Sequence, residues 1–395
     1  MGSYLLVFAV SAGVSFLVTP LVRRLCLRLG WIDQPSDRKV HPKPTPTAGG
    51  LAIFAGVAAG LFASRFIPFL SGLHETTSDL EAALVASLVI VLVGLIDDTR
   101  GMSPLGKLAG QILAAGLLVL AGVQLLYFYF PGQGVLSLSP DLAVPLTVLW
   151  VVAMINAVNL IDGLDGLAAG MVSIGAAAFF LYMAFGPGAG GAPSTAALLA
   201  AIVAGAAIGF LPWNFYPARI FMGDTGSGLL GLMMAVATIS GVGRNAYPPS
   251  GGDLAAIAIP IAVPLLVLAV PFLDVLLAIV RRMRKGLGIH HADKEHIHHR
   301  LMDIGHSQRQ AVLLMYLWSA LISGCALAVA FIDGRLLVLA IVVVAMLIAT
   351  VLPPLIRDRS PHGSDASGTQ EAVGATPAEE TEPLAPAPRR GAQAR

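Results

Sequence analysis

Five polar clusters interrupt an otherwise apolar chain, and each holds side chains that can bind metal ions or phosphates. In chain order they are HPKPTPTAGG (41–50), DDTRG (97–101) with Lys107 and Gln111 after it, NAVNLIDGLDGLA (156–168), WNFYPARIFMGDTGS (213–227) and RRMRKGLGIHHADKEHIHHRL (281–301). Carboxylate and amide oxygens are the ligands that Mg²⁺ prefers. Lys, Arg and His suit phosphate oxygens. The clusters therefore predict a metal-assisted site for a phosphorylated substrate, where positioning and charge neutralisation dominate catalysis.

Asp97 and Asp98 end an apolar run, where negative charge opposes the dipole of a helix C-terminus. Two adjacent carboxylates there need a compensating cation, unless they simply mark a solvated helix end. They could contact a metal or a phosphate, or deprotonate an acceptor phosphate. A phosphate monoester has a second pKa of about 6, so a base would find little proton to remove. We expect positioning to matter more than proton transfer.

In the third cluster, Asn156, Asn159, Asp162 and Asp165 recur at every third residue. On one continuous helix these four would spread over about 180°, which is too wide for a single ion. Two glycines within the cluster offer a break. We therefore expect the helix to end near Leu160 and the carboxylates to fold back on the amides.

In GDTGS (223–227), Asp224 or Thr225 could simply cap the helix that follows. Asn214 and Phe221 lie just before this segment. Their proximity favours a different hypothesis, in which Asp224 is a metal ligand beside a nucleotide contact.

The fifth cluster supplies His296, His298 and His299 among several arginines. His-x-His is a zinc-ligand spacing, and a pH-sensing loop is another alternative. No nearby cysteine or fourth fixed ligand supports zinc, so we favour contacts to a diphosphate or leaving group. The arginines could equally anchor the chain at anionic lipid headgroups.

The chain that must position these clusters is strongly apolar. Of its 395 residues, 56% are hydrophobic and 12% are charged, and its mean hydropathy is +0.80. Soluble domains are about 45–50% apolar and about 25% charged. This composition excludes a soluble globular enzyme, a disordered protein and a nucleic-acid binder with a broad basic surface. It predicts an all-α integral membrane protein.

Eleven apolar runs are candidates for transmembrane helices, each of which needs about 20 residues. They cover 4–22, 49–70, 80–96, 105–126, 142–161, 167–185, 195–211, 228–242, 254–280, 311–331 and 336–352. The ninth contains Pro260, Pro264 and Pro271, so we expect it to be kinked or broken. Residues 1–355 are predicted to form a polytopic membrane domain, and residues 356–395 a disordered cytoplasmic tail.

The basic residues predict how these helices are oriented. The loops after the odd-numbered helices, together with the tail, hold 21 of the 24 Lys and Arg residues. Positive residues mark the cytoplasmic side, so the N-terminus lies outside and the C-terminus is cytoplasmic. No basic residue precedes the first run, which fits an uncleaved first helix rather than a signal peptide. All five polar clusters fall on the cytoplasmic side.

Four motifs in this order, DDTRG, NAVNLIDGLDGLA, FMGDTGS and HIHHRL, resemble those of the polyprenyl-phosphate N-acetylhexosamine-1-phosphate transferases. The resemblance covers about residues 1–355. It implies transfer of a sugar 1-phosphate from a UDP-sugar to a membrane polyprenyl phosphate, with release of UMP and a requirement for Mg²⁺ or Mn²⁺. It also implies a multi-pass protein of the bacterial inner membrane, with its active site facing the cytoplasm and a homodimer as a further expectation.

The resemblance implies a role for each matching residue. Catalytic roles fall on Asp97, Asp98, Asp162, Asp165, His296, His298 and His299; substrate binding on Lys43, Thr47, Lys107, Asn214, Phe221 and Arg300; and metal binding on Asn159 and Asp224. Among these, Phe221 matches a ring that stacks on uracil.

The histidine motif separates two branches of this family. His-Ile-His-His resembles the branch that uses UDP-N-acetylglucosamine, which initiates teichoic-acid, O-antigen or other envelope glycans. The alternative, the phospho-N-acetylmuramoyl-pentapeptide transferase of peptidoglycan synthesis, carries three consecutive histidines. A secondary transporter is the alternative from another class, but it should place its acids near the bilayer midplane and show inverted repeats.

Overall fold

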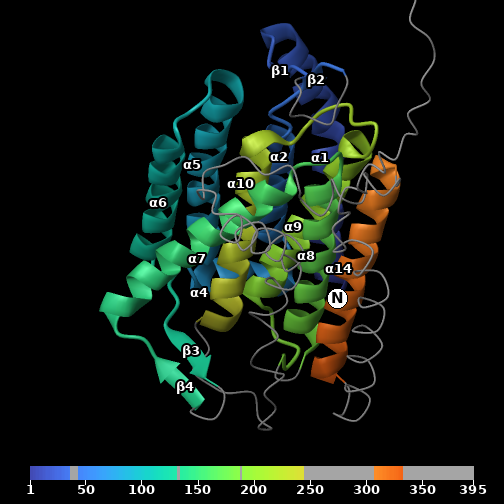
Figure 1. Ribbon diagram of the computed structural model, residues 1–395. Coiled ribbons are helices and arrows are strands. Elements are labelled where there is room, and N and C mark those ends of the chain that lie inside the picture. The colour runs from blue at the N-terminus through green and yellow to red at the C-terminus, as the bar shows by residue number, and fades with distance from the viewer. Residues whose placement is uncertain (36–42, 131–133, 187–188, 244–306, 332–395) are drawn as a thin grey trace, which may run out of the picture. The chain divides into compact units, whose positions relative to one another are not determined.

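The computed structural model describes residues 1–35, 43–130, 134–186, 189–243 and 307–331, and these are mostly helical (Figure 1). The helices are α1 (Gly2–Leu29), α2 (Gly50–Ser64), α3 (Pro68–Ser71), α4 (Leu73–Thr76), α5 (Asp79–Arg100), α6 (Pro104–Leu120), α7 (Pro140–Ile161), α8 (Leu167–Phe185), α9 (Thr195–Asn214), α10 (Gly223–Thr238), the π-helix η1 (Ile239–Gly243) and α14 (Gln308–Phe331). Strands β1 (Ile32–Asp33) and β2 (Thr45–Pro46) pair antiparallel, as do β3 (Tyr127–Phe130) and β4 (Gly134–Ser137).

Among the described residues, six helices are long and apolar enough to cross a membrane, or seven if a bent pair counts as one span. Large apolar side chains on their outer faces are exposed, such as Leu17 (67%), Leu92 (50%) and Leu149 (63%). Such surface suits contact with lipid. The expectation of a helical, multi-pass membrane protein is confirmed at this level. The ninth and eleventh apolar runs and residues 356–395 lie outside the described residues, so the expected total of eleven stays a prediction.

The second apolar run differs from the expected single helix. Helix α2 ends at Ser64, and α3 and α4 follow at an angle of 96° to it. Proline disfavours helical geometry in the residue before it, and Ile67 before Pro68 is accordingly extended. A hydrogen-bonded chain stabilises the bend, because His74 contacts Ser64 Oγ through Nε2 at 2.9 Å and Glu81 Oε1 through Nδ1 at 3.1 Å.

The strands β3 and β4 were also not expected from the hydropathy pattern. They form a hairpin between α6 and α7, a stretch where the fourth apolar run has ended and the fifth has not begun. An extended segment of this length carries no helical periodicity, so a search for apolar runs passes over it.

Helix α10 forms the centre of the described bundle and is buried from Thr225 to Thr238. It contacts α2, α5, α7 and α9. Two glycines allow the closest approaches: a Cβ at Gly50 would collide with the backbone of Thr225 and Gly226, and one at Gly94 with that of Asp224 and Thr225. Small residues at crossings let helix backbones approach closely in membranes. The first turn of α10 is therefore held between α2 and α5.

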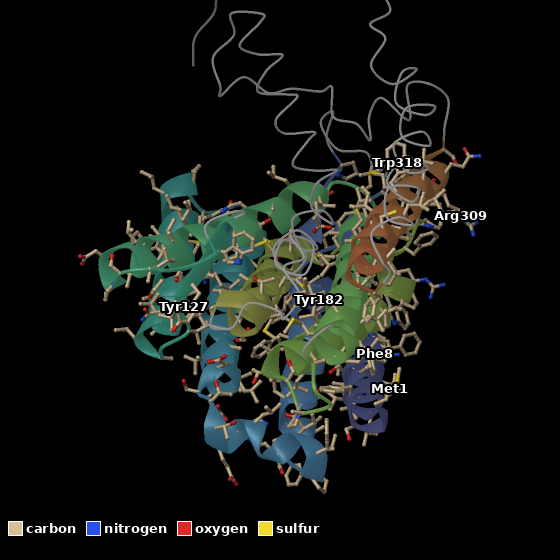
Figure 2. All side chains as sticks on the ribbon, turned by 90° about the horizontal axis from the view of Figure 1, so that it is seen from below. Met1, Phe8, Tyr127, Tyr182, Arg309 and Trp318 are labelled. Atoms are coloured by element: carbon tan, nitrogen blue, oxygen red, sulfur yellow. The ribbon has the colours of Figure 1, made fainter. Side chains whose placement is uncertain are left out.

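On another face of the bundle, α14 packs along α8, and Figure 2 marks α14 by Arg309 and Trp318. Tyr316 of α14 lies where a Cβ at Gly170 would be, and its hydroxyl donates to the Gly166 carbonyl. This contact fixes α14 against the start of α8, at the end of the third polar cluster.

Candidate active site

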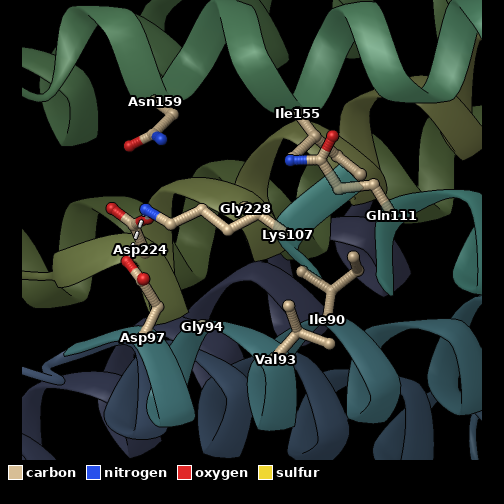
Figure 3. A pocket seen from close by; sticks show the side chains of 10 residues that line it. All are labelled: Ile90, Val93, Gly94, Asp97, Lys107, Gln111, Ile155, Asn159, Asp224 and Gly228. Atoms are coloured by element: carbon tan, nitrogen blue, oxygen red, sulfur yellow. Dashed lines mark hydrogen bonds and ion pairs between the residues drawn. The ribbon is translucent and has the colours of Figure 1, made fainter. Parts of the chain in front are cut away.

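Four of the predicted residues line one pocket between α5, α6, α7 and α10: Asp97, Lys107, Asn159 and Asp224 (Figure 3). Each lies in a helix turn at the same end of the bundle, since α5 and α7 end there and α6 and α10 begin there. The cavity measures about 30 Å³, enough for an ion or a water molecule. The other lining residues are Ile90, Val93, Gly94, Gln111, Ile155 and Gly228.

Lys107 forms ion pairs with both acids of the pocket. Its Nζ lies 2.5 Å from Asp97 Oδ2 and 2.6 Å from Asp224 Oδ2. The second oxygen of Asp97, Oδ1, accepts a hydrogen bond from the Met102 amide at 2.7 Å. Lys107 is therefore the compensating cation that an acid at the end of α5 requires.

Asp98 has different partners from its neighbour. Its Oδ1 accepts from the Asp224 amide at 2.8 Å, and its Oδ2 accepts from the Thr225 amide at 3.1 Å and from Thr225 Oγ1 at 2.6 Å. The charge of Asp98 is thus balanced by the N-terminus of α10, the positive end of that helix dipole. GDTGS does begin a helix, but the alternative of a cap from Asp224 or Thr225 is wrong, because Asp98 of α5 accepts from the first amides of α10.

The third cluster ends its helix as expected, with α7 finishing at Ile161. The expected folding of carboxylates onto amides is wrong, because both amides turn to neighbouring helices. Asn159 Oδ1 accepts from Ser227 Oγ of α10 at 3.2 Å, and Asn156 Nδ2 donates to Gln111 Oε1 of α6 at 2.7 Å.

The two acids after α7 lie close to the pocket without lining it. Removal from water raises the pKa of the Asp162 carboxyl well above its usual range, and the nearby carboxylates of Asp224, Asp98 and Asp165 add to the rise. Asp165 is buried, and its Oδ2 accepts from the Ala218 amide at 2.9 Å. Asp165 therefore holds the segment 215–222 between α9 and α10.

Asn214 lies just before that segment, and Phe221 lies near its end. Asn214 is buried and donates from Nδ2 to the Ile220 carbonyl at 3.1 Å. The half-buried Phe221 donates its amide to the Pro46 carbonyl at 2.8 Å, and its carbonyl accepts from the Gly49 amide at 2.9 Å. Both residues shape the segment leading into α10, and neither lines the pocket.

The remaining predicted residues lie apart from the pocket or outside the described residues. Thr47 is buried, and its carbonyl accepts from Cys26 Sγ at 2.9 Å. Lys43 is exposed. The members of the fifth cluster lie outside the described residues: His296, His298, His299 and Arg300.

The pocket residues fit a divalent ion that a substrate helps to hold. No three His, Cys, Asp or Glu side chains in the described residues gather closely enough to hold a metal alone. Mg²⁺, however, is commonly bound by one or two carboxylates together with substrate phosphates. Here two carboxylates and the Asn159 amide oxygen share one pocket, and the Lys107 ammonium already occupies a place for positive charge between the acids.

Some contributors to the site were not singled out from the sequence. Ser227 binds the Asn159 side chain, while Gly94 and Gly228 line the pocket from α5 and α10. A glycine inside an apolar helical run often has a packing reason, which is the signal that could have identified the last two.

Comparisons with known proteins show which family the chain is similar to. The family described as glycosyl transferase family 4 matches residues 80–242, which hold the four predicted residues that line the pocket. A decaprenyl-phosphate N-acetylglucosaminephosphotransferase of Mycolicibacterium smegmatis is 40% identical over 91% of this chain and 90% of its own length. A probable undecaprenyl-phosphate N-acetylglucosaminyl 1-phosphate transferase of Bacillus subtilis is 37% identical over 89% of this chain and 92% of its own length.

A phospho-N-acetylmuramoyl-pentapeptide-transferase of Mycolicibacterium smegmatis is also 37% identical, but over only 60% of this chain and 76% of its own length. The N-acetylglucosamine enzymes thus match almost from end to end, whereas the pentapeptide enzyme matches in part. This chain belongs to glycosyl transferase family 4, on the branch of the polyprenyl-phosphate N-acetylglucosamine-1-phosphate transferases.

Proposed function

We propose that this chain transfers N-acetylglucosamine 1-phosphate from UDP-N-acetylglucosamine to a membrane polyprenyl phosphate. The transfer releases UMP and starts the synthesis of a cell-envelope glycan. The observation that carries the proposal is a single pocket that holds two carboxylates, an amide and a lysine. The chain that forms this pocket matches named N-acetylglucosaminephosphotransferases over about nine tenths of its length. Their names specify decaprenyl and undecaprenyl phosphate, so either lipid is a suitable acceptor for the test.

In this reaction, an oxygen of the polyprenyl phosphate attacks the β-phosphorus of the nucleotide sugar. The new P–O bond forms as the bond from the β-phosphorus to the bridging oxygen breaks, and UMP leaves with that oxygen. Asp97, Asn159 and Asp224 would hold Mg²⁺ or Mn²⁺, which when bound neutralises diphosphate charge. Lys107 adds a positive charge at the same place, and Phe221 would stack on the uracil.

We further propose that the pocket faces the cytoplasm. The basic residues favour that side, and a hydrophilic UDP-sugar would arrive from the cytosol. The pocket residues lie in terminal turns of their helices rather than halfway along them. This placement favours an enzyme that meets a lipid phosphate at the membrane boundary over a transporter with acids at the midplane.

The test uses purified protein, labelled UDP-N-acetylglucosamine, decaprenyl or undecaprenyl phosphate and Mg²⁺, followed by lipid extraction. A parallel reaction contains the muramoyl-pentapeptide nucleotide. We expect a labelled lipid product only with UDP-N-acetylglucosamine, and no product in EDTA. Product from the pentapeptide nucleotide alone would contradict the assigned branch, and product formation undiminished by EDTA would contradict the metal requirement.

A pair of variants tests the pocket. Asp224→Asn should lower UMP release about 100-fold or more, as expected when a group that stabilises transition-state charge is lost. Asp141→Asn changes an exposed acid in the first turn of α7, at the opposite end of that helix from Asn159, and should have little effect. Full metal-dependent activity of Asp224→Asn would refute the role assigned to Asp224.

A further inference from the structure

The carboxylate of Asp98 sits on the N-terminus of α10, although it belongs to α5. All three of its hydrogen bonds come from the first turn of α10, namely from the amides of Asp224 and Thr225 and from the Thr225 hydroxyl. The first amides of a helix have no partner within the helix. The Asp98 carboxylate accepts hydrogen bonds from two of these amides. Such bonds to a charged group are stronger than bonds between neutral groups.

The local sequence is built to admit this carboxylate. Gly223, the first residue of α10, has a φ of +69°, which glycine adopts readily and other residues rarely do. A Cβ at Gly223 would also collide with the Asp98 carboxylate. In the part of the chain that the structure describes, no side chain at the start of α10 caps that helix. The cap therefore depends on Asp98.

Two adjacent acids of one motif thus have separate tasks. Consecutive residues on a helix point about 100° apart. Asp97 accordingly lines the pocket beside Lys107, while Asp98 turns to α10 and is not among the lining residues. Both oxygens of Asp98 already accept hydrogen bonds, which suits a structural anchor better than a base or nucleophile.

We propose that Asp98 and Thr225 form a positioning pair that fixes the first turn of α10 and so aims the Asp224 carboxylate into the pocket. Asp98 holds the backbone amide of Asp224, while the side chain of Asp224 meets Lys107. Thr225 is fully buried, and its hydroxyl makes the shortest of the three bonds to Asp98. This inference rests on the proposed function in one respect, namely that Asp224 holds the divalent ion.

The test compares Thr225→Val, which removes the hydroxyl at nearly constant volume, with Thr225→Ser, which keeps it. The readout is Mn²⁺ binding to the purified protein with UDP-N-acetylglucosamine present and the lipid acceptor left out, measured by electron paramagnetic resonance. We expect Thr225→Val to weaken Mn²⁺ binding about 10-fold, as is typical when a group supporting a metal ligand is lost, and Thr225→Ser to stay within about 2-fold of the original. UMP release by Thr225→Val should recover at high Mn²⁺, because the reacting groups are unchanged.

Equal Mn²⁺ binding by Thr225→Val and the unchanged protein would overturn the pair. Asp98→Asn gives a second measurement, because a base or nucleophile at this position predicts lost turnover with unaltered Mn²⁺ binding, whereas the positioning pair predicts weaker binding. If Thr225→Val does not survive purification, Thr225→Ala replaces it with the same expectations. Failure of the unchanged protein to bind Mn²⁺ would contradict the metal role of Asp224 itself, so the two failures are distinguishable.

Discussion

Lys107→Met should leave the carboxylates of Asp97 and Asp224 facing each other without a cation. Lys107 Nζ lies within 2.6 Å of both, and the three side chains are 32%, 13% and 28% exposed. A hydrogen bond to a charged group contributes about 1.5–3 kcal/mol. Partial exposure and salt screening reduce this contribution. We therefore expect a net loss of about 2 kcal/mol in the free energy of unfolding, which is smaller than two full bonds would give.

Thermal unfolding of the purified protein, in EDTA and in Mg²⁺, measures this loss. We expect the melting temperature of Lys107→Met in EDTA to fall by several degrees. Mg²⁺ should restore the melting temperature, because a divalent ion balances the same two carboxylates. A ligand at a free concentration of 100 times its Kd stabilises a protein by about 2.7 kcal/mol. The unchanged protein should gain less from Mg²⁺, since the Lys107 ammonium already occupies that place.

Two control variants isolate the effect. Lys107→Arg keeps the charge and should lose less stability, and Arg100→Met removes an exposed cation at the end of α5 and should change little. If Lys107→Met melts like the unchanged protein and gains no more from Mg²⁺, then Lys107 does not balance the two acids, and the proposed place of the ion is wrong.

Three other substitutions test the scaffold. Gly170→Ala should lower stability by about 1–3 kcal/mol, because its Cβ would collide with the Tyr316 ring; an unaltered melting temperature would contradict this packing. His74→Ala should lower stability by about 1–2 kcal/mol yet leave UMP release unchanged, since the bend after α2 lies about 25 Å along α5 from the pocket; reduced turnover at full folding would count against this separation. Asp165→Ala should speed trypsin cleavage after the exposed Arg219 by releasing the segment 215–222, and equal digestion rates would disprove the tether.

The apolar runs predicted most of the described helices because a bilayer imposes a strong local requirement. A chain in lipid must satisfy its backbone groups within each segment, so about 20 apolar residues specify a helix wherever they occur. The break near Leu160 was predictable for the same reason, since its glycines and acids interrupt such a segment, and α7 does end at Ile161. The bend after Ser64 was not, because its apolar run continues past the turn at Pro68.

The residue pattern predicts a helical membrane protein, the residue types that gather at its polar helix ends and the family that it resembles. Helix packing establishes that Asp97 faces Lys107 while Asp98 caps α10, and that Asn159 turns to Ser227 instead of to its neighbouring acids. The physical reason is the distance along the chain between the residues that interact. Helix formation depends on residues a few positions apart, whereas these partners are 68 or more residues apart, except for Asp97 and Lys107, and meet only when helices pack closely.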